Sequence, residues 1–161
     1  IVYNVPGRTG VSCTPEHYAR LAEIPRINGV KEASGDISLV SRTRYLCGDA
    51  LNIWSGNDDQ TLPMLALGAK GVISVASNIV PQVMATLCAA ALSGDFFTAR
   101  AIHEAYAGLF DALFYEVNPI PVKTAMQMLG WDSGRLRLPL CPMAEGNAAK
   151  LQNCLESLQL L

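Results

Sequence analysis

Apolar residues in the first half of the chain form short continuous runs, separated by segments with helical spacing. Such runs predict strands, because a strand covered on both faces of a parallel sheet is apolar throughout. Four runs therefore predict four strands, over residues 1–5, 29–33, 51–55 and 71–75.

The segments between these runs carry signals that start helices. Thr14-Pro15-Glu16 offers an N-cap hydroxyl, a proline at the first helical position and an acid in the first turn. Asp36 can cap a second helix, and Asp58 or Asp59 can open a third that ends near Gly68. Alternating strands and helices are typical of βα units in a parallel sheet.

After Ser77 the alternation stops, and only helices are expected. The candidates are residues 81–93, 95–115, 119–129 and about 143–160. We therefore divide the chain into a part with four parallel βα units, residues 1–94, and a C-terminal helical region, residues 95–161.

Two α/β architectures fit four βα units. One is the second half of a (β/α)8 barrel, which in full takes about 250 residues, and the other is an open flavodoxin-like sheet. An open sheet of that kind usually carries a glycine-rich phosphate loop after its first strand. Pro6-Gly7-Arg8-Thr9-Gly10 does not match G-x-G-x-x-G, so the half-barrel is favoured.

Composition excludes several classes of protein. The chain has 161 residues, of which 50% are hydrophobic and 16% charged, with a formal net charge of −2. This is too apolar for a disordered chain and lacks the basic cluster of a nucleic-acid binder. No apolar run reaches the roughly 18 residues of a membrane span, so no membrane partner is expected.

Cysteine use points to a reducing compartment. Five cysteines without a C-x-x-C pair, accompanied only by His17 and His103, indicate free thiols and no metal site. We expect a cytoplasmic protein, with a plastid as the alternative if a transit peptide precedes it. Because the chain opens inside an apolar run without an initiator methionine, we also expect a fragment.

Polar residues at the ends of the predicted strands are the candidates for chemistry. Lys31 interrupts an apolar strand; it is either a nucleophilic amine in a dry barrel interior or a strand-end lysine that reaches solvent. Tyr3 can relay protons or be a core tyrosine, and Arg8 can grip a carboxylate or be an ordinary surface arginine. On the helix predicted over residues 95–115, we interpret His103 as a structural residue. Three aromatic residues on one face of the same helix predict a core or an interface; they are Tyr106, Phe110 and Phe114.

Several motifs in order resemble the second half of the dihydrodipicolinate synthase family, over essentially the whole chain. They are Tyr3-Asn4-Val5-Pro6-Gly7-Arg8-Thr9-Gly10, Val30-Lys31-Glu32-Ala33-Ser34-Gly35-Asp36, Gly71-Val72-Ile73-Ser74-Val75, Asn118-Pro119-Ile120-Pro121-Val122-Lys123 and Arg137-Leu138-Pro139-Leu140. The resemblance implies the C-terminal half of a (β/α)8 barrel and a lyase of the class I aldolase type.

The resemblance also implies a role for each site residue. Lys31 would form an imine with pyruvate, and Tyr3 would relay protons. Arg8 would hold the carboxylate of L-aspartate-4-semialdehyde, while the backbone of Gly56 and Ile73 would line the pyruvate pocket. The implied product is 4-hydroxy-tetrahydrodipicolinate, in lysine (diaminopimelate) biosynthesis. No metal or organic cofactor is expected, because the imine itself is the electron sink.

Two alternatives stay open. A related pyruvate-dependent aldolase, such as N-acetylneuraminate lyase, shares the barrel and the imine-forming lysine. A catalytically silent half-barrel would instead only self-associate, since residues 1–5 and 71–75 would form apolar sheet edges. The expected partners are therefore pyruvate, aspartate semialdehyde and either further copies of the chain, as in the family's dimers and tetramers, or the missing N-terminal half. That half would supply further active-site groups, so the activity of the chain alone is open.

Overall fold

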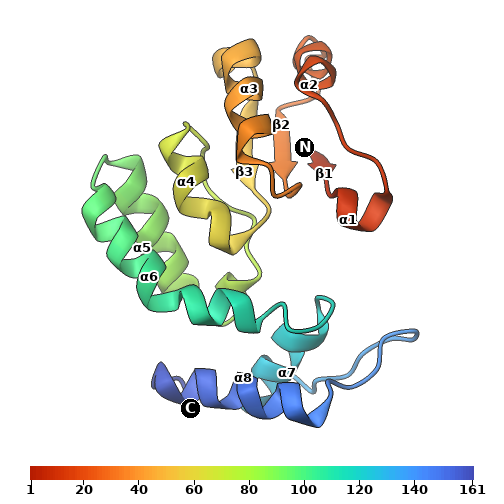
Figure 1. Cartoon of the computed structure of the whole chain (residues 1–161), viewed down its shortest axis with the longest axis vertical. Helices are drawn as coiled ribbons and strands as arrows, with labels where there is room; N and C mark the ends of the chain where they lie inside the picture. Colours follow the sequence, from red (N-terminus) through yellow and green to blue (C-terminus); the bar gives the residue numbers. More distant parts are fainter.

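A parallel sheet organises the first half of the molecule. The computed structural model describes residues 1–161, and its three strands are β1 (Val2–Asn4), β2 (Gly29–Glu32) and β3 (Asn52–Ser55), in the order β1-β2-β3 (Figure 1). Lys31 of β2 lies opposite Tyr3 on one side and Trp54 on the other. Three of the four predicted strands are thus confirmed.

The prediction of a fourth strand over residues 71–75 is wrong in its extent. Val72 alone forms a parallel bridge, to Ser55, supported by hydrogen bonds from Ser55 N to the Gly71 carbonyl (2.9 Å) and from Ile73 N to the Ser55 carbonyl (2.8 Å). Beyond Ile73 the chain leaves the sheet, because the Asp58 carboxylate accepts the N–H of Val75 at 3.1 Å and that of the next residue at 2.9 Å.

Short helices connect the strands. They are α1 (Pro6–Thr9), α2 (Pro15–Ala22), α3 (Ile37–Cys47) and α4 (Thr61–Ala66), with single 3-10 turns η1 (Gly48–Ala50), η2 (Asp58–Gln60) and η3 (Ala76–Asn78). The segment directly after the first strand is the one-turn helix α1. Gly10, with φ of +69°, ends it in a left-handed conformation that suits glycine.

The predicted caps are confirmed for the second and third of these helices. The Thr14 hydroxyl accepts the His17 N–H at 3.4 Å, and the His17 Nδ1 accepts the Thr14 N–H at 3.1 Å. Asp36 likewise accepts the N–H of Leu39 at 3.1 Å. His17 therefore completes a reciprocal capping box, a use that the sequence pattern had not indicated.

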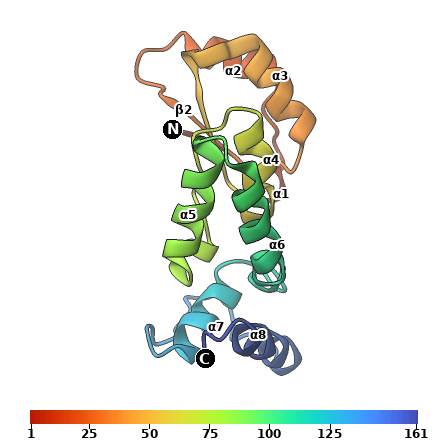
Figure 2. The same ribbon diagram turned by 90° about the vertical axis from the view of Figure 1, so that its left-hand side faces the viewer.

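Only helices follow η3, as predicted. They are α5 (Pro81–Leu92), α6 (Phe96–Ala112), α7 (Ile120–Met128) and α8 (Glu145–Ser157). Helices α5 and α6 run side by side, and α7 and α8 lie together at the far end of the molecule (Figure 2). Asp95 caps α6 by accepting the Thr98 N–H at 3.0 Å. None of the helices combines the length and apolar character that crossing a lipid bilayer requires.

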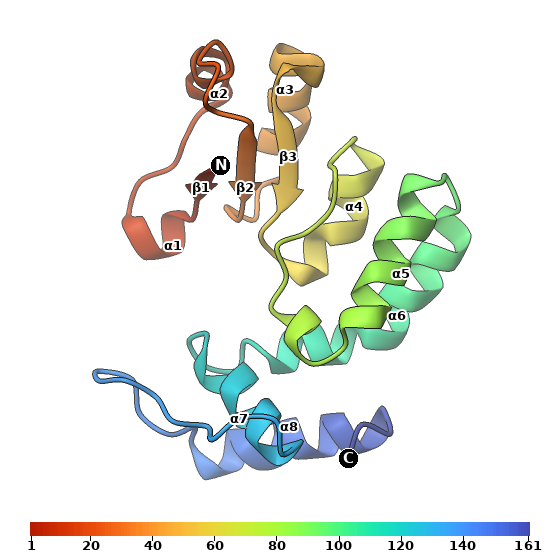
Figure 3. The same cartoon turned by 180° about the vertical axis from the view of Figure 1, so that it is seen from behind.

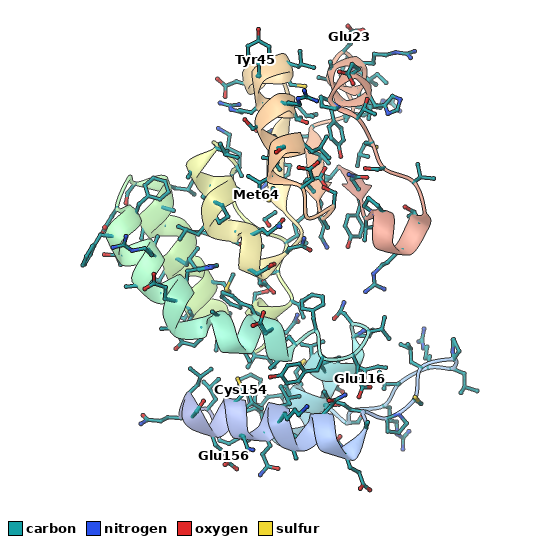
Figure 4. All side chains as sticks on the ribbon, in the orientation of Figure 1. Glu23, Tyr45, Met64, Glu116, Cys154 and Glu156 are labelled. Carbon is teal, nitrogen blue, oxygen red and sulfur yellow. The ribbon has the colours of Figure 1, made fainter.

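Three apolar clusters hold these elements together. The first cluster contains residues of η3 and of all four helices from α5 through α8. The second packs α2 and α3 against the sheet through residues such as Tyr18, Val30 and Val40. The third joins Leu87 of α5 to Ala99 of α6. Met64 of α4, which is labelled in Figure 4, is fully buried in the second cluster. Because the first and third clusters include residues from both sides of position 94, the division at that position stays a prediction.

The three aromatic residues expected in a core or an interface are buried only in part, and Phe114 lies beyond the end of α6. Phe110 is buried in the first cluster and Tyr106 packs partly against it, whereas Phe114 is 47% exposed. The His103 ring lies 5.7 Å from that of Phe110, and its Nδ1 is buried without a hydrogen-bond partner.

Candidate active site

Tyr3, Lys31 and Trp54 form a row across the sheet, on the face opposite the one that carries the buried Val30 and Ile53. The carboxyl ends of the strands point toward α7 and α8 (Figure 3). In the same view no helix lies in front of the strands. In parallel α/β folds, catalytic groups gather at this end of the strands.

The structure brings two of the predicted site residues into contact. The Lys31 Nζ lies 4.2 Å from the centroid of the Tyr3 ring, within the range of a cation–π interaction. Within this chain Tyr3 is 46% exposed. Lys31 itself is half-buried, with its neighbours Val30 and Glu32 fully buried on the opposite face of the sheet.

Gly56 lies beside the stem of Lys31. A Cβ at position 56 would lie 3.1 Å from the Lys31 Cε and 2.6 Å from the Ala33 Cβ, so only glycine leaves this space open. The Gly56 N–H donates to the Glu32 carbonyl at 2.7 Å, which holds it against β2. Ile73, through its hydrogen bond to Ser55, lies next to the same strand end.

Arg8 is placed differently from the other candidates. It lies in the last turn of α1, directly after β1, and its Nη2 donates to the Asn118 carbonyl at 3.1 Å. This bond joins residues that are 110 positions apart and draws the α6–α7 connection toward α1. The structure thus gathers Tyr3, Lys31, Gly56 and Ile73, whereas the Arg8 guanidinium binds the α6–α7 connection.

A buried polar network behind Lys31 was missed by reasoning from sequence. Glu32 is 3% exposed, and its carboxylate accepts hydrogen bonds from the Tyr18 hydroxyl at 2.6 Å, from Asn4 Nδ2 at 3.0 Å and from Ser34 N at 2.7 Å. A signal for it was present. Successive strand residues point to opposite faces, so a charge directly after Lys31 has to enter the helix-covered side.

Burial, together with the hydrogen bond to Glu32, raises the pKa of the Tyr18 phenol far above its ordinary value. The raised pKa favours the neutral phenol, whose hydroxyl donates to the Glu32 side chain. At the neighbouring strand end, burial raises the pKa of Asp59, and the nearby Asp111 carboxylate adds to this effect.

Other features lie apart from this row. A cavity of about 560 Å³ runs along α2 and is lined by residues such as Cys13, His17 and Arg20. All five cysteines are free, and burial raises the thiol pKa of Cys47, Cys88 and Cys154. No three His, Cys, Asp or Glu side chains are arranged to hold a metal ion.

Comparison with known proteins decides the family. The model of the dihydrodipicolinate synthetase family matches residues 1–158, nearly the whole chain. The chain belongs to this family. It is 50% identical, over 161 residues, to the 4-hydroxy-tetrahydrodipicolinate synthase of Geobacter sulfurreducens, covering all of this chain and 56% of that enzyme.

Solved structures of synthases are similar throughout the chain. The dihydrodipicolinate synthase of Thermotoga maritima gives a TM-score of 0.96 at 46% identity, covering 99% of this chain and 56% of that one. The chloride-inhibited enzyme of Acinetobacter baumannii, complexed with pyruvate, gives a TM-score of 0.96 at 40% identity, covering 99% of this chain and 55% of that one. The chain thus spans a little over half the length of these relatives.

The similarity confirms the predicted fold over the open-sheet alternative. The chain has the α/β architecture of one half of a (β/α)8 barrel, followed by a helical region, as in the corresponding part of the synthase structures. The row of Tyr3 and Lys31 accordingly lies on the side of the sheet that faces the inside of a complete barrel.

Proposed function

We propose that the chain carries the pyruvate-activating part of a 4-hydroxy-tetrahydrodipicolinate synthase, a lyase of lysine (diaminopimelate) biosynthesis. The observation that supports this most is the contact of the Lys31 amine with the Tyr3 ring at the carboxyl ends of the strands. The family assignment adds support, as does the bound pyruvate in the similar Acinetobacter baumannii enzyme.

In the proposed reaction, the free amine of Lys31 attacks the C2 carbonyl carbon of pyruvate and water leaves, which gives a protonated imine. The imine withdraws electrons, so a C3 proton is lost and an enamine forms. The enamine carbon attacks the aldehyde carbon of L-aspartate-4-semialdehyde. The amino group of the adduct then attacks C2, closes the ring and releases Lys31 as an amine.

The surrounding residues would assist this chemistry in distinct ways. Tyr3, next to the Lys31 amine, would accept and return protons during loss of water and ring closure. Backbone groups of Gly56 and Ile73 would line the pyruvate side of the pocket. Arg8, which retains free N–H donors beyond its bond to Asn118, would bind the carboxylate of the second substrate.

The open face of the sheet bears on what the active protein contains. Tyr3 is 46% exposed and Ile73 is 40% exposed, whereas imine chemistry on a lysine is favoured in a site that excludes water. We propose that this face is covered in the active protein, either by the remaining half of a barrel or by a second copy of the chain. We further propose that the protein works in the cytoplasm and without a cofactor.

The proposal is tested by supplying the chain with pyruvate and a choice of acceptors. With aspartate semialdehyde we expect cyclic product, detected by NMR, and with N-acetylmannosamine we expect none. Lys31→Ala should abolish product formation, whereas Lys70→Ala, which changes an exposed lysine away from the row, should not. Turnover of N-acetylmannosamine in preference would instead identify a lyase of the neuraminate type. No turnover with either acceptor, even when the remaining half of a barrel is supplied with the chain, would contradict the proposal.

A further inference from the structure

We propose that Glu32 is a positioning residue: from the helix-covered face of the sheet, it holds β1 against β2 and thereby keeps the Tyr3 ring next to the Lys31 amine. The proposal deepens the function proposed above and rests on it for its catalytic consequence. Glu32 does not touch the candidate substrate site, because it points to the opposite face of the sheet from Lys31.

The register of the strands gives the first step of the argument. Asn4 lies opposite Glu32 in the same ladder that places Tyr3 opposite Lys31. The Asn4 Nδ2 donates to both carboxylate oxygens of Glu32, each at 3.0 Å, and the Asn4 Oδ1 accepts the Cys13 N–H at 3.1 Å. Both ends of the Asn4 side chain are therefore fixed, one residue away from Tyr3.

The second step concerns β1 itself. The strand β1 has only three residues, and its backbone pairs with β2 over those three positions. Hydrogen bonds to a carboxylate are about twice as strong as neutral ones. In so short a strand, the two hydrogen bonds from Asn4 to the Glu32 carboxylate add to the few backbone bonds with β2 and thereby help to hold Tyr3 in position.

The third step concerns what holds Glu32. The carboxylate is fully satisfied, since the Tyr18 hydroxyl on α2 and the Ser34 N–H in the following loop complete its four contacts. Buried networks with every member satisfied are rigid, whereas losing one partner leaves the other groups unpaired at a cost. Glu32 thus connects α2, the β2 loop and β1, and the Tyr3–Lys31 contact depends on all three.

Two variants separate positioning from general stability. Glu32→Gln keeps the shape but replaces an acceptor oxygen by an N–H2 donor among groups that already donate. Tyr18→Phe removes a single donor and leaves the carboxylate and Asn4 in place, so the fold survives. Glu23→Gln, an exposed glutamate at the end of α2, is the matched control.

The first readout needs no substrate. The lysines are reductively methylated with 13C-formaldehyde and dimethylamine-borane, and the dimethyl signal of Lys31 is assigned with Lys31→Arg. In the parent chain the Tyr3 ring should displace this signal upfield of that of Lys70. We expect Glu32→Gln to remove most of the displacement and Tyr18→Phe to remove part of it, while Glu23→Gln leaves it unchanged. An unchanged displacement in both folded variants would overturn the proposal.

The second readout is the rate at which borohydride traps pyruvate on Lys31 at saturating pyruvate. Glu32→Gln should slow trapping by about 10- to 100-fold, the loss typical of a misplaced group. Normal trapping in a folded Glu32→Gln variant would also overturn the proposal. A parent chain that traps no pyruvate would defeat the proposed function instead, and the NMR signal would still decide whether Glu32 positions Tyr3.

Discussion

Gly56→Ala is the substitution that most sharply probes the packing around Lys31. Its Cβ would lie 2.6 Å from the Ala33 Cβ and 3.1 Å from both the Glu32 carbonyl oxygen and the Lys31 Cε. Carbon atoms in ordinary contact lie about 3.5–4.0 Å apart, so the side chains at positions 33 and 56 would have to separate by about 1 Å. Neither a Cβ nor a backbone carbonyl can rotate away, which leaves the Lys31 stem and the β3 end to move.

Overpacking of this kind costs about 1–3 kcal/mol of unfolding free energy. For a chain of this length each kcal/mol lowers the melting temperature by about 2–4 °C. The displaced Lys31 stem should also slow pyruvate trapping by about 10- to 100-fold, since errors near 1 Å have effects of that size.

Calorimetry and the rate of borohydride trapping measure the two effects on the same sample. Gly108→Ala is the control, because position 108 is exposed in the middle of α6 and a Cβ there meets nothing within 4 Å. That control should gain up to about 1 kcal/mol from helix propensity and trap pyruvate at the parent rate. A Gly56→Ala variant with the parent melting temperature and trapping rate would refute the packing argument.

Three further predictions concern stability. Thr14→Ala should lower the free energy of unfolding by about 1 kcal/mol, measured by urea titration, because α2 loses its capping box. Asp58→Ala should cost about 1–3 kcal/mol in the same assay and loosen residues 72–76 in hydrogen exchange, since one carboxylate oxygen accepts both the Val75 and Ala76 N–H groups. Hydrogen bonds from Thr98 lower the pKa of Asp95, so its stabilisation is present above about pH 3.9 and is lost as the pH falls through the folded pKa. Asp95→Asn should keep the cap at pH 7 and reduce the acid dependence of the melting temperature.

Much of the fold could be predicted because it depends on local signals. The caps at Thr14, Asp36 and Asp95 and the apolar runs fixed the positions of the helices and of three strands to within a few residues. The fourth strand was overestimated because Val72 to Val75 have a strand composition, yet the Asp58 carboxylate, far from them in sequence, takes the N–H of Val75. The local sequence pattern contains no signal for such a competing hydrogen bond.

Only those features of the candidate site that depend on residues close together in the sequence could be predicted. Lys31 stood out because a charge interrupts an apolar strand, and its contact with Tyr3 follows from strand register. The exposure of Tyr3 and the bond between Arg8 and Asn118 depend on packing across the whole chain. The burial of Glu32 could be predicted, because side chains alternate between the two faces along a strand, but its hydrogen-bond partners could not.

The central claim is that these 161 residues make one lysine selectively reactive toward pyruvate. The most direct test is the intact mass after incubation with pyruvate and borohydride, followed by peptide mapping. We expect one reduced pyruvate adduct, on Lys31. Adducts spread over Lys70, Lys123 and Lys150 as well, or no adduct on a folded chain, would contradict it.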